Sequence, residues 1–182
     1  LKQVASIRVD NYLETRRAMD YLFRYNHREI ALIGSNILSP AGNETTSQRT
    51  KAWEDAFLES GLEIPEHLRL PLATLQNQDQ NAIRDFISRQ SFTAAFFTHG
   101  SSFLNFIPYY KSLGKKDINN LQLLVFDNIE PFYEYSSLPC AYIKMPLDKF
   151  GAAALEYLRR KAHDPAYPVL NLIMPCSMNI RY

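Results

Sequence analysis

Residues 29–34 read EIALIG, a short and continuously apolar run that ends at Gly34. A strand that is apolar at every position, rather than at alternate positions, is typical of a sheet that is buried on both faces. Two further runs have the same character, FTAAFF (92–97) and LQLLVFD (121–127). Segments with helical spacing of apolar residues separate these runs. Repeated strand–helix units of this kind predict an α/β domain with a doubly wound parallel sheet.

The segments around these strands predict the remaining elements. Helices are expected at 12–26, 45–57, 77–90, 101–114 and 146–162, and weaker strands at 68–75, 141–145 and 167–175. Thr45 and Gln48 fit a capping box, which would place Arg49 in the first turn of its helix. Pro71 indicates an edge strand or a strand that ends early, because proline cannot donate to a neighbouring strand.

The composition is that of a globular protein with one domain or slightly more. Of its 182 residues 46% are apolar and 21% charged, which argues against disorder. The net charge of +1 lacks the basic excess of a self-sufficient nucleic-acid binder. No apolar run approaches the roughly 18 residues of a membrane span, and the chain does not open on a signal-like segment. Cys140 and Cys176 lack metal-ligand spacing and are expected to be buried thiols in a reducing cytosol.

Polar residues follow each of the three buried strands. In open parallel sheets, ligands bind beyond the carboxyl ends of the strands, so these residues should meet at one edge. Their mixture of charges, amides and hydroxyls, with phenylalanines nearby, suits a polyhydroxylated ligand, although Arg49 could equally pair with a carboxylate or phosphate. The candidates are Ser35, Asn36, Arg49, Phe97, Thr98, His99, Asp127 and Asn128, with Phe103 and Phe132 as further apolar surface.

Structural roles are the alternative for the main candidates. Arg49 could bridge to Glu44, Asp127 could cap the turn that follows it, and His99 could be an idle loop residue. The sequence contains no GxGxxG, GxxxxGK[ST], GxSxG or HExxH motif, and its four histidines do not cluster. We therefore expect neither an enzyme nor a bound cofactor or metal ion.

The order of the motifs resembles the effector-binding core of the LacI/GalR family of bacterial transcription regulators. The resemblance runs from about residue 7 to the C-terminus. It rests on IRVDN (7–11), NHREIALIG (26–34), QRTKAWEDAFLESGL (48–62), FTAAFFTHG (92–100), LQLLVFDN (121–128) and LPCAYIKMPLDKFGAAALEYL (138–158). Six segments in family order imply the fold of type I periplasmic binding proteins.

The resemblance also implies roles for single residues. Family members bind the effector through an arginine and an aspartate at the positions of Arg49 and Asp127. Where the family usually has Asn-Asp after the second strand, this chain has His99-Gly100, which implies an altered ligand preference. Family counterparts of Met145 and Leu147 face the binding cleft, so Leu147 is an expected apolar wall.

The family architecture has two subdomains and a DNA-binding head. By analogy, residues 11–138 and 165–182 would form the C-terminal subdomain, and residues 1–10 and 142–162 would be parts of an N-terminal subdomain. The remainder of that subdomain and the helix-turn-helix head are not in the 182 residues. The expectation is a core fragment of a larger regulator.

The functional expectation is the ligand-binding and dimerising module of a sugar-responsive repressor in the cytoplasm. Its partners would be a small-molecule effector, a second copy of the chain and operator DNA reached through another domain, with no membrane. Three alternatives stay open: an extracytoplasmic sugar-binding protein of the same fold, a different DNA-binding head on this core, and a small α/β enzyme.

Overall fold

The computed structural model describes residues 4–35, 44–89, 91–112, 121–130 and 140–181. At its centre is a six-stranded sheet with the strand order β3-β2-β4-β5-β6-β8. The strands are β2 Ile30–Ser35, β3 Arg69–Pro71, β4 Ala94–Phe97, β5 Gln122–Phe126, β6 Cys140–Lys144 and β8 Ser177–Arg181. Neighbouring strands run parallel except β6 and β8. The predicted α/β sheet is confirmed, and Pro71 lies on an edge strand as expected.

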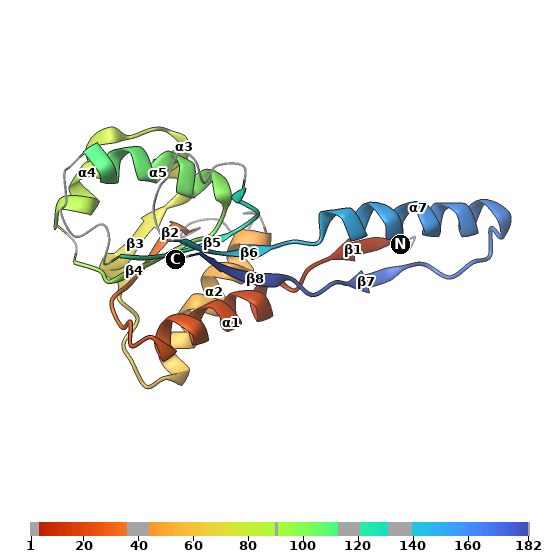
Figure 1. Ribbon diagram of the computed structural model, residues 1–182, viewed down its shortest axis with the longest axis horizontal. Helices are drawn as coiled ribbons and strands as arrows, with labels where there is room; N and C mark the ends of the chain where they lie inside the picture. The colour runs from red at the N-terminus through yellow and green to blue at the C-terminus, as the bar shows by residue number, and fades with distance from the viewer. Residues whose placement is uncertain (1–3, 36–43, 90, 113–120, 131–139, 182) are drawn as a thin grey trace.

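Helices cover both faces of this sheet (Figure 1). One face carries α1 Asn11–Arg24 and α2 Glu44–Glu59, and the other carries α3 Leu72–Gln76, α4 Gln80–Arg89 and α5 Gly100–Ser112, with a short 3-10 helix η1 Glu66–Leu68 leading into β3. Successive strand residues point to opposite faces. Phe96 therefore packs with Trp53 and Phe57, whereas Phe97 packs with Phe103 and Phe106 in a second core.

A smaller unit, here called the arm, extends from one end of the main sheet (Figure 1). In the arm, β1 Ser6–Arg8 pairs in parallel with β7 Asn171–Ile173, and α7 Leu147–His163 lies along β1. Three short connections join the two units, between β1 and α1, β6 and α7, and β7 and β8. No residue of α7 is buried, and Leu155 and Leu158 are 70% and 63% exposed. The apolar face of the arm is uncovered.

The structure corrects three expected boundaries. The capping box is wrong, because α2 already includes Glu44, so Thr45 lies inside the helix and Arg49 in its second turn. The Gln48 side chain instead donates to the Glu44 carboxylate at 3.0 Å. The expected last strand at 167–175 is only the three-residue β7, and a further strand, β8, follows it in the other sheet. Since β7 pairs with β1, residues 165–182 do not lie wholly with the larger unit.

Candidate functional site

The side chains that follow β4 and β5 meet α1, α2 and the start of α5 at the carboxyl edge of the main sheet. We call the interacting group here the strand-end cluster; it consists of Asn11, Arg49, Thr98, His99 and Asp127. Its members come from four segments that are far apart in sequence: the start of α1, α2, the β4–α5 junction and the end of β5. The structure therefore brings together the arginine, histidine and aspartate that the sequence predicted.

Arg49 is fixed by contacts on several sides and is only 3% exposed. Its Nη2 and Nε donate to Asn11 Oδ1 at 2.8 and 3.1 Å, and its Nη1 donates to the Thr98 carbonyl. The guanidinium carbon lies 3.4 Å from the centroid of the Phe126 ring. A guanidinium has five N–H donors, of which these bonds use three, so two remain. The expected alternative partner, Glu44, is not among the contacts of Arg49.

Burial and charge act in opposite directions on the Arg49 guanidinium. Burial lowers the pKa of Arg49 to about 10, and the nearby Asp127 carboxylate raises it. Arg49 therefore remains a cation at neutral pH. A cation that is desolvated and locked in place by hydrogen bonds can bind a polar ligand without losing side-chain entropy.

Asp127 lies at the end of β5 in a strained backbone conformation with φ +141°. Its N–H donates to the Ile143 carbonyl at 3.1 Å, and its Oδ2 accepts from the Gly100 N–H at 2.9 Å. Asp127 thus caps α5, not the turn that follows it. Its second oxygen, Oδ1, has no hydrogen-bond partner among the described residues and is half-buried with the rest of the side chain. Strain of this kind is typical of functional sites.

His99 lies between two threonine hydroxyls. Its Nδ1 is 3.0 Å from Thr98 Oγ1, and its Nε2 is 3.3 Å from Thr46 Oγ1. Thr98 Oγ1 donates to the Gly34 carbonyl at 2.7 Å, so it accepts from Nδ1–H, and Nε2 is left as an acceptor. Burial, with help from the Arg49 charge, lowers the pKa of His99. The imidazole is therefore neutral at neutral pH.

This arrangement links His99 to the pH dependence of stability. Because the pKa of His99 is lower in the folded chain than the ordinary value of about 6.5, protons bind the unfolded chain more tightly, and the unfolding free energy should fall as pH drops below about 6.5. Urea unfolding above and below that pH should show a smaller fall in His99→Gln. Burial also lowers the pKa of His27, so His27 should account for the fall in unfolding free energy that remains in His99→Gln. An unchanged fall in His99→Gln, matching the exposed control His163→Gln, would contradict the assignment.

The other predicted residues have mixed outcomes. Ser35 is 1% exposed, and its hydroxyl has no partner among the described residues. Leu147 begins α7 and is 56% exposed, so it is accessible as a wall. Phe97 is fully buried against Phe103 and Phe106, so in this structure its ring lines the core and not the strand ends. Asn36 and Phe132 lie outside the described residues.

Sequence reasoning missed two residues that contact Arg49. Asn11 anchors Arg49 from the first residue of α1, and no local pattern signals a contact across 38 positions. The Phe126 ring packs against the Arg49 guanidinium. An aromatic residue directly before Asp127 at a strand end could have indicated this contact. Both act by orienting Arg49.

Metal binding and thiol chemistry find no support among the described residues. No group of three or more His, Cys, Asp or Glu side chains in the described ranges could hold a metal ion. Cys176 lies close enough to Arg49 and Asp127 to feel their charges, but burial raises its pKa to about 12, so it remains a thiol. Within the same ranges, no helix is both long and apolar enough to cross a membrane. The cluster supplies fixed hydrogen-bond donors and acceptors, which suits binding.

Comparisons with known proteins agree with this geometry. A family model described as a periplasmic binding protein-like domain matches residues 19–182. A search of curated proteins gave no significant match. Among solved structures, the chain is similar to the transcriptional regulator CelR in complex with cellobiose, with 19% identity and a TM-score of 0.78 over 99% of this chain and 54% of that one.

Two further solved structures show the same likeness. CcpA of Lactococcus lactis, a transcription regulator, has 18% identity and a TM-score of 0.76 over 99% of this chain and 65% of its own. A LacI family regulator from Enterococcus faecalis with bound ribose has 18% identity and a TM-score of 0.76 over 96% and 61%. At such identities the likeness establishes the fold. The chain spans between about half and two thirds of the length of these structures.

Proposed function

The chain belongs to the family of periplasmic binding protein-like domains, and on that premise we propose that it is the effector-binding module of a LacI-type transcription regulator. The observation that carries the proposal is the strand-end cluster. There Arg49 keeps two N–H donors and Asp127 keeps Oδ1, none of which is used by a described residue. A polar ligand requires rigidly held groups of opposite charge that still have free hydrogen-bond donors and acceptors, and the strand ends provide them.

The charges favour an uncharged sugar as the effector. The N-terminus of α5, where an anionic group would otherwise gain from the helix dipole, is already occupied by the Asp127 carboxylate. The Arg49 cation and the Asp127 anion offset each other. Sugar hydroxyls both donate and accept, so one ligand can use Asp127 Oδ1 and the Arg49 N–H groups together. Cellobiose and ribose, which two of the similar structures bind, have this chemistry.

The arm supports a two-subdomain arrangement. A two-stranded sheet with one helix buries too little apolar surface to be stable by itself, and the exposed Leu155 and Leu158 need a cover. We take the arm as part of an N-terminal subdomain that further residues complete. Leu147, at the junction between the two units, would then close the site from the other side.

A regulatory mechanism follows from this arrangement. Ligand held between the strand-end cluster and the second subdomain would stabilise one relative orientation of the two. In a cytoplasmic homodimer this would change the spacing of attached DNA-binding domains, and hence operator affinity, because the ligand binds one state more tightly. This repressor mechanism predicts that ligand and operator DNA affect each other's affinity reciprocally.

A thermal-shift screen tests the proposal. Neutral mono- and disaccharides, sugar phosphates and nucleobases would be added separately to the chain. We expect a saturable rise in melting temperature with one class of neutral sugar, because a ligand that binds only the folded state stabilises it. Stabilisation by the sugar phosphates but by no neutral sugar would contradict the proposed ligand class, and no stabilisation by any compound would count against effector binding.

A further inference from the structure

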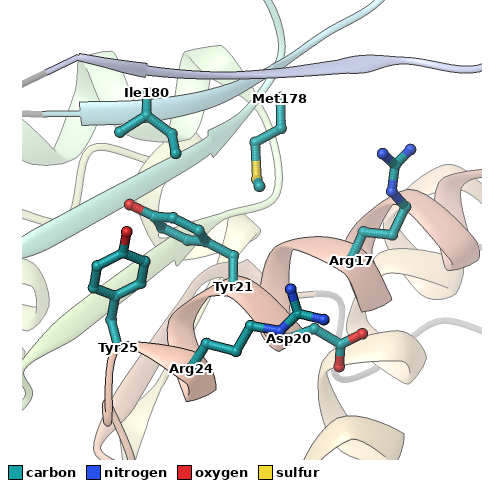
Figure 2. A pocket seen from close by; sticks show the side chains of 7 residues that line it. All are labelled: Arg17, Asp20, Tyr21, Arg24, Tyr25, Met178 and Ile180. Atoms are coloured by element: carbon teal, nitrogen blue, oxygen red, sulfur yellow. The ribbon is translucent and has the colours of Figure 1, made fainter.

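A cavity lies away from the strand-end cluster, between α1 and the edge strand β8. Its volume is about 570 Å³, within the usual range for small-ligand sites. Figure 2 shows Tyr21 and Tyr25 rising from α1 toward Met178 and Ile180, which descend from β8. None of the residues that line it belongs to the strand-end cluster.

One side of this cavity suits an aromatic ring. The rings of Tyr21 and Tyr25 have their centroids 4.8 Å apart and are tilted by 49°. Tyr25 is 57% exposed, and Ile180 opposite is 38% exposed. A flat apolar group placed between Tyr25 and Ile180 would cover the exposed surface of both side chains. The Met178 thioether would make a favourable contact with the edge of its ring.

The polar residues of the cavity carry opposite charges that are not paired with each other. Asp20 and Arg24 are one helical turn apart on α1, a spacing at which opposite charges commonly form an ion pair. Here neither side chain forms an ion pair or hydrogen bond with any described residue. Both a cation and an anion are therefore available to a ligand on the same wall.

Arg17, at the other end of the cavity, is already engaged. Its Nη1 donates to Glu14 Oε2 at 3.0 Å, and Glu14 Oε1 accepts from the Cys176 N–H at 2.9 Å. Glu14 is 6% exposed, so displacing it from Arg17 would leave a buried carboxylate with fewer partners. A ligand anion therefore gains more from Arg24 than from Arg17.

We propose that the cavity between α1 and β8 is an accessory site for a zwitterionic small molecule with an aromatic body, that is, an aromatic α-amino acid. Its carboxylate pairs with Arg24 and its ammonium group with Asp20. Its ring lies between Tyr25 and the side chains of Met178 and Ile180. The site is independent of the effector proposed at the strand ends.

Calorimetric titration with three probes tests this site. The probes are L-phenylalanine, 3-phenylpropanoate, which lacks the ammonium group, and phenethylamine, which lacks the carboxylate. We expect saturable binding of L-phenylalanine and affinities about tenfold lower or worse for the two analogues, because each loses one charged hydrogen-bonding group. Arg24→Gln and Asp20→Asn should each weaken the binding of L-phenylalanine by a similar factor. The control Arg84→Gln, an exposed arginine on α4 outside the cavity, should change nothing.

The same titrations define the results that would overturn the proposal. Absence of saturable L-phenylalanine binding at millimolar concentrations would refute it. Equal binding of all three probes would show that the charged pair does not recognise the ligand. Binding that survives in Arg24→Gln but is lost in Asp127→Asn would place the amino acid at the strand-end cluster. Asp20 and Arg24 are both exposed, so circular dichroism should confirm folded variants.

Discussion

Gly34→Ala is expected to lower the free energy of unfolding by about 3 kcal/mol, because it combines backbone strain with overpacking. Gly34 has φ +90°, which only glycine adopts readily. An added Cβ would lie 2.4 Å from Ser102 Oγ and 2.5 Å from Thr98 Oγ1, both in fully buried residues. Thr98 also bonds the Gly34 carbonyl and His99, so the substitution should disturb the strand-end cluster as well.

Urea unfolding of two control variants separates strain from overpacking. Gly61 has φ +69° but open space around the position of a Cβ, so Gly61→Ala should cost only the strain, about 1 kcal/mol. Ser102 Oγ has no partner among the described residues, so adding Ser102→Ala to Gly34→Ala should recover part of the loss. Equal losses in the two glycine variants would contradict the close approach at Gly34.

Arg49→Met is expected to abolish effector binding and to destabilise the fold by about 3 kcal/mol. The substitution removes two bonds to Asn11 Oδ1 and one to the Thr98 carbonyl, and it leaves Asp127 without its nearby cation. Arg49→Lys keeps the charge but not the planar fork, so it should retain part of the stability and little of the binding. Urea unfolding and calorimetry measure the two effects.

Two results with the Arg49 variants would contradict the roles assigned to this side chain. An unfolding free energy unchanged in Arg49→Met would mean that the buried guanidinium does not hold Asn11 and Thr98 together. Full ligand affinity in Arg49→Lys would show that the fork geometry is not used, since lysine cannot reproduce the bidentate contact with Asn11.

Much of the fold could be predicted from the sequence, because a central parallel strand must be apolar on both faces. EIALIG, FTAAFF and LQLLVFD lie in β2, β4 and β5 as expected. Because such strands are apolar at every position, the sequence does not show which face of the sheet a residue occupies. Phe96 and Phe97 are equally apolar, and only the packing of α5 against the sheet shows that Phe97 lies in the core on the α5 side. Thr45 failed as a cap because helical structure already includes Glu44.

The site was predictable in part for a similar physical reason. Strand ends meet at one edge, so Arg49, His99 and Asp127 could be grouped from sequence. Their partners could not, because the Asn11–Arg49 contact depends on how α1 packs against α2. The pairing of β7 with β1 was also hidden, since both strands are three residues long and 165 positions separate Ser6 from Asn171.

The most direct test of effector binding at the strand ends is calorimetric titration of the neutral sugar that gives the largest thermal shift. It would be titrated into the unmodified chain, Asp127→Asn and the control Asp85→Asn, whose carboxylate pairs with Arg89 on the surface of α4. We expect Asp127→Asn to weaken sugar binding about tenfold or more, because Oδ1 loses its charge, and Asp85→Asn to leave sugar binding unchanged. Equal affinity in all three proteins would contradict the account.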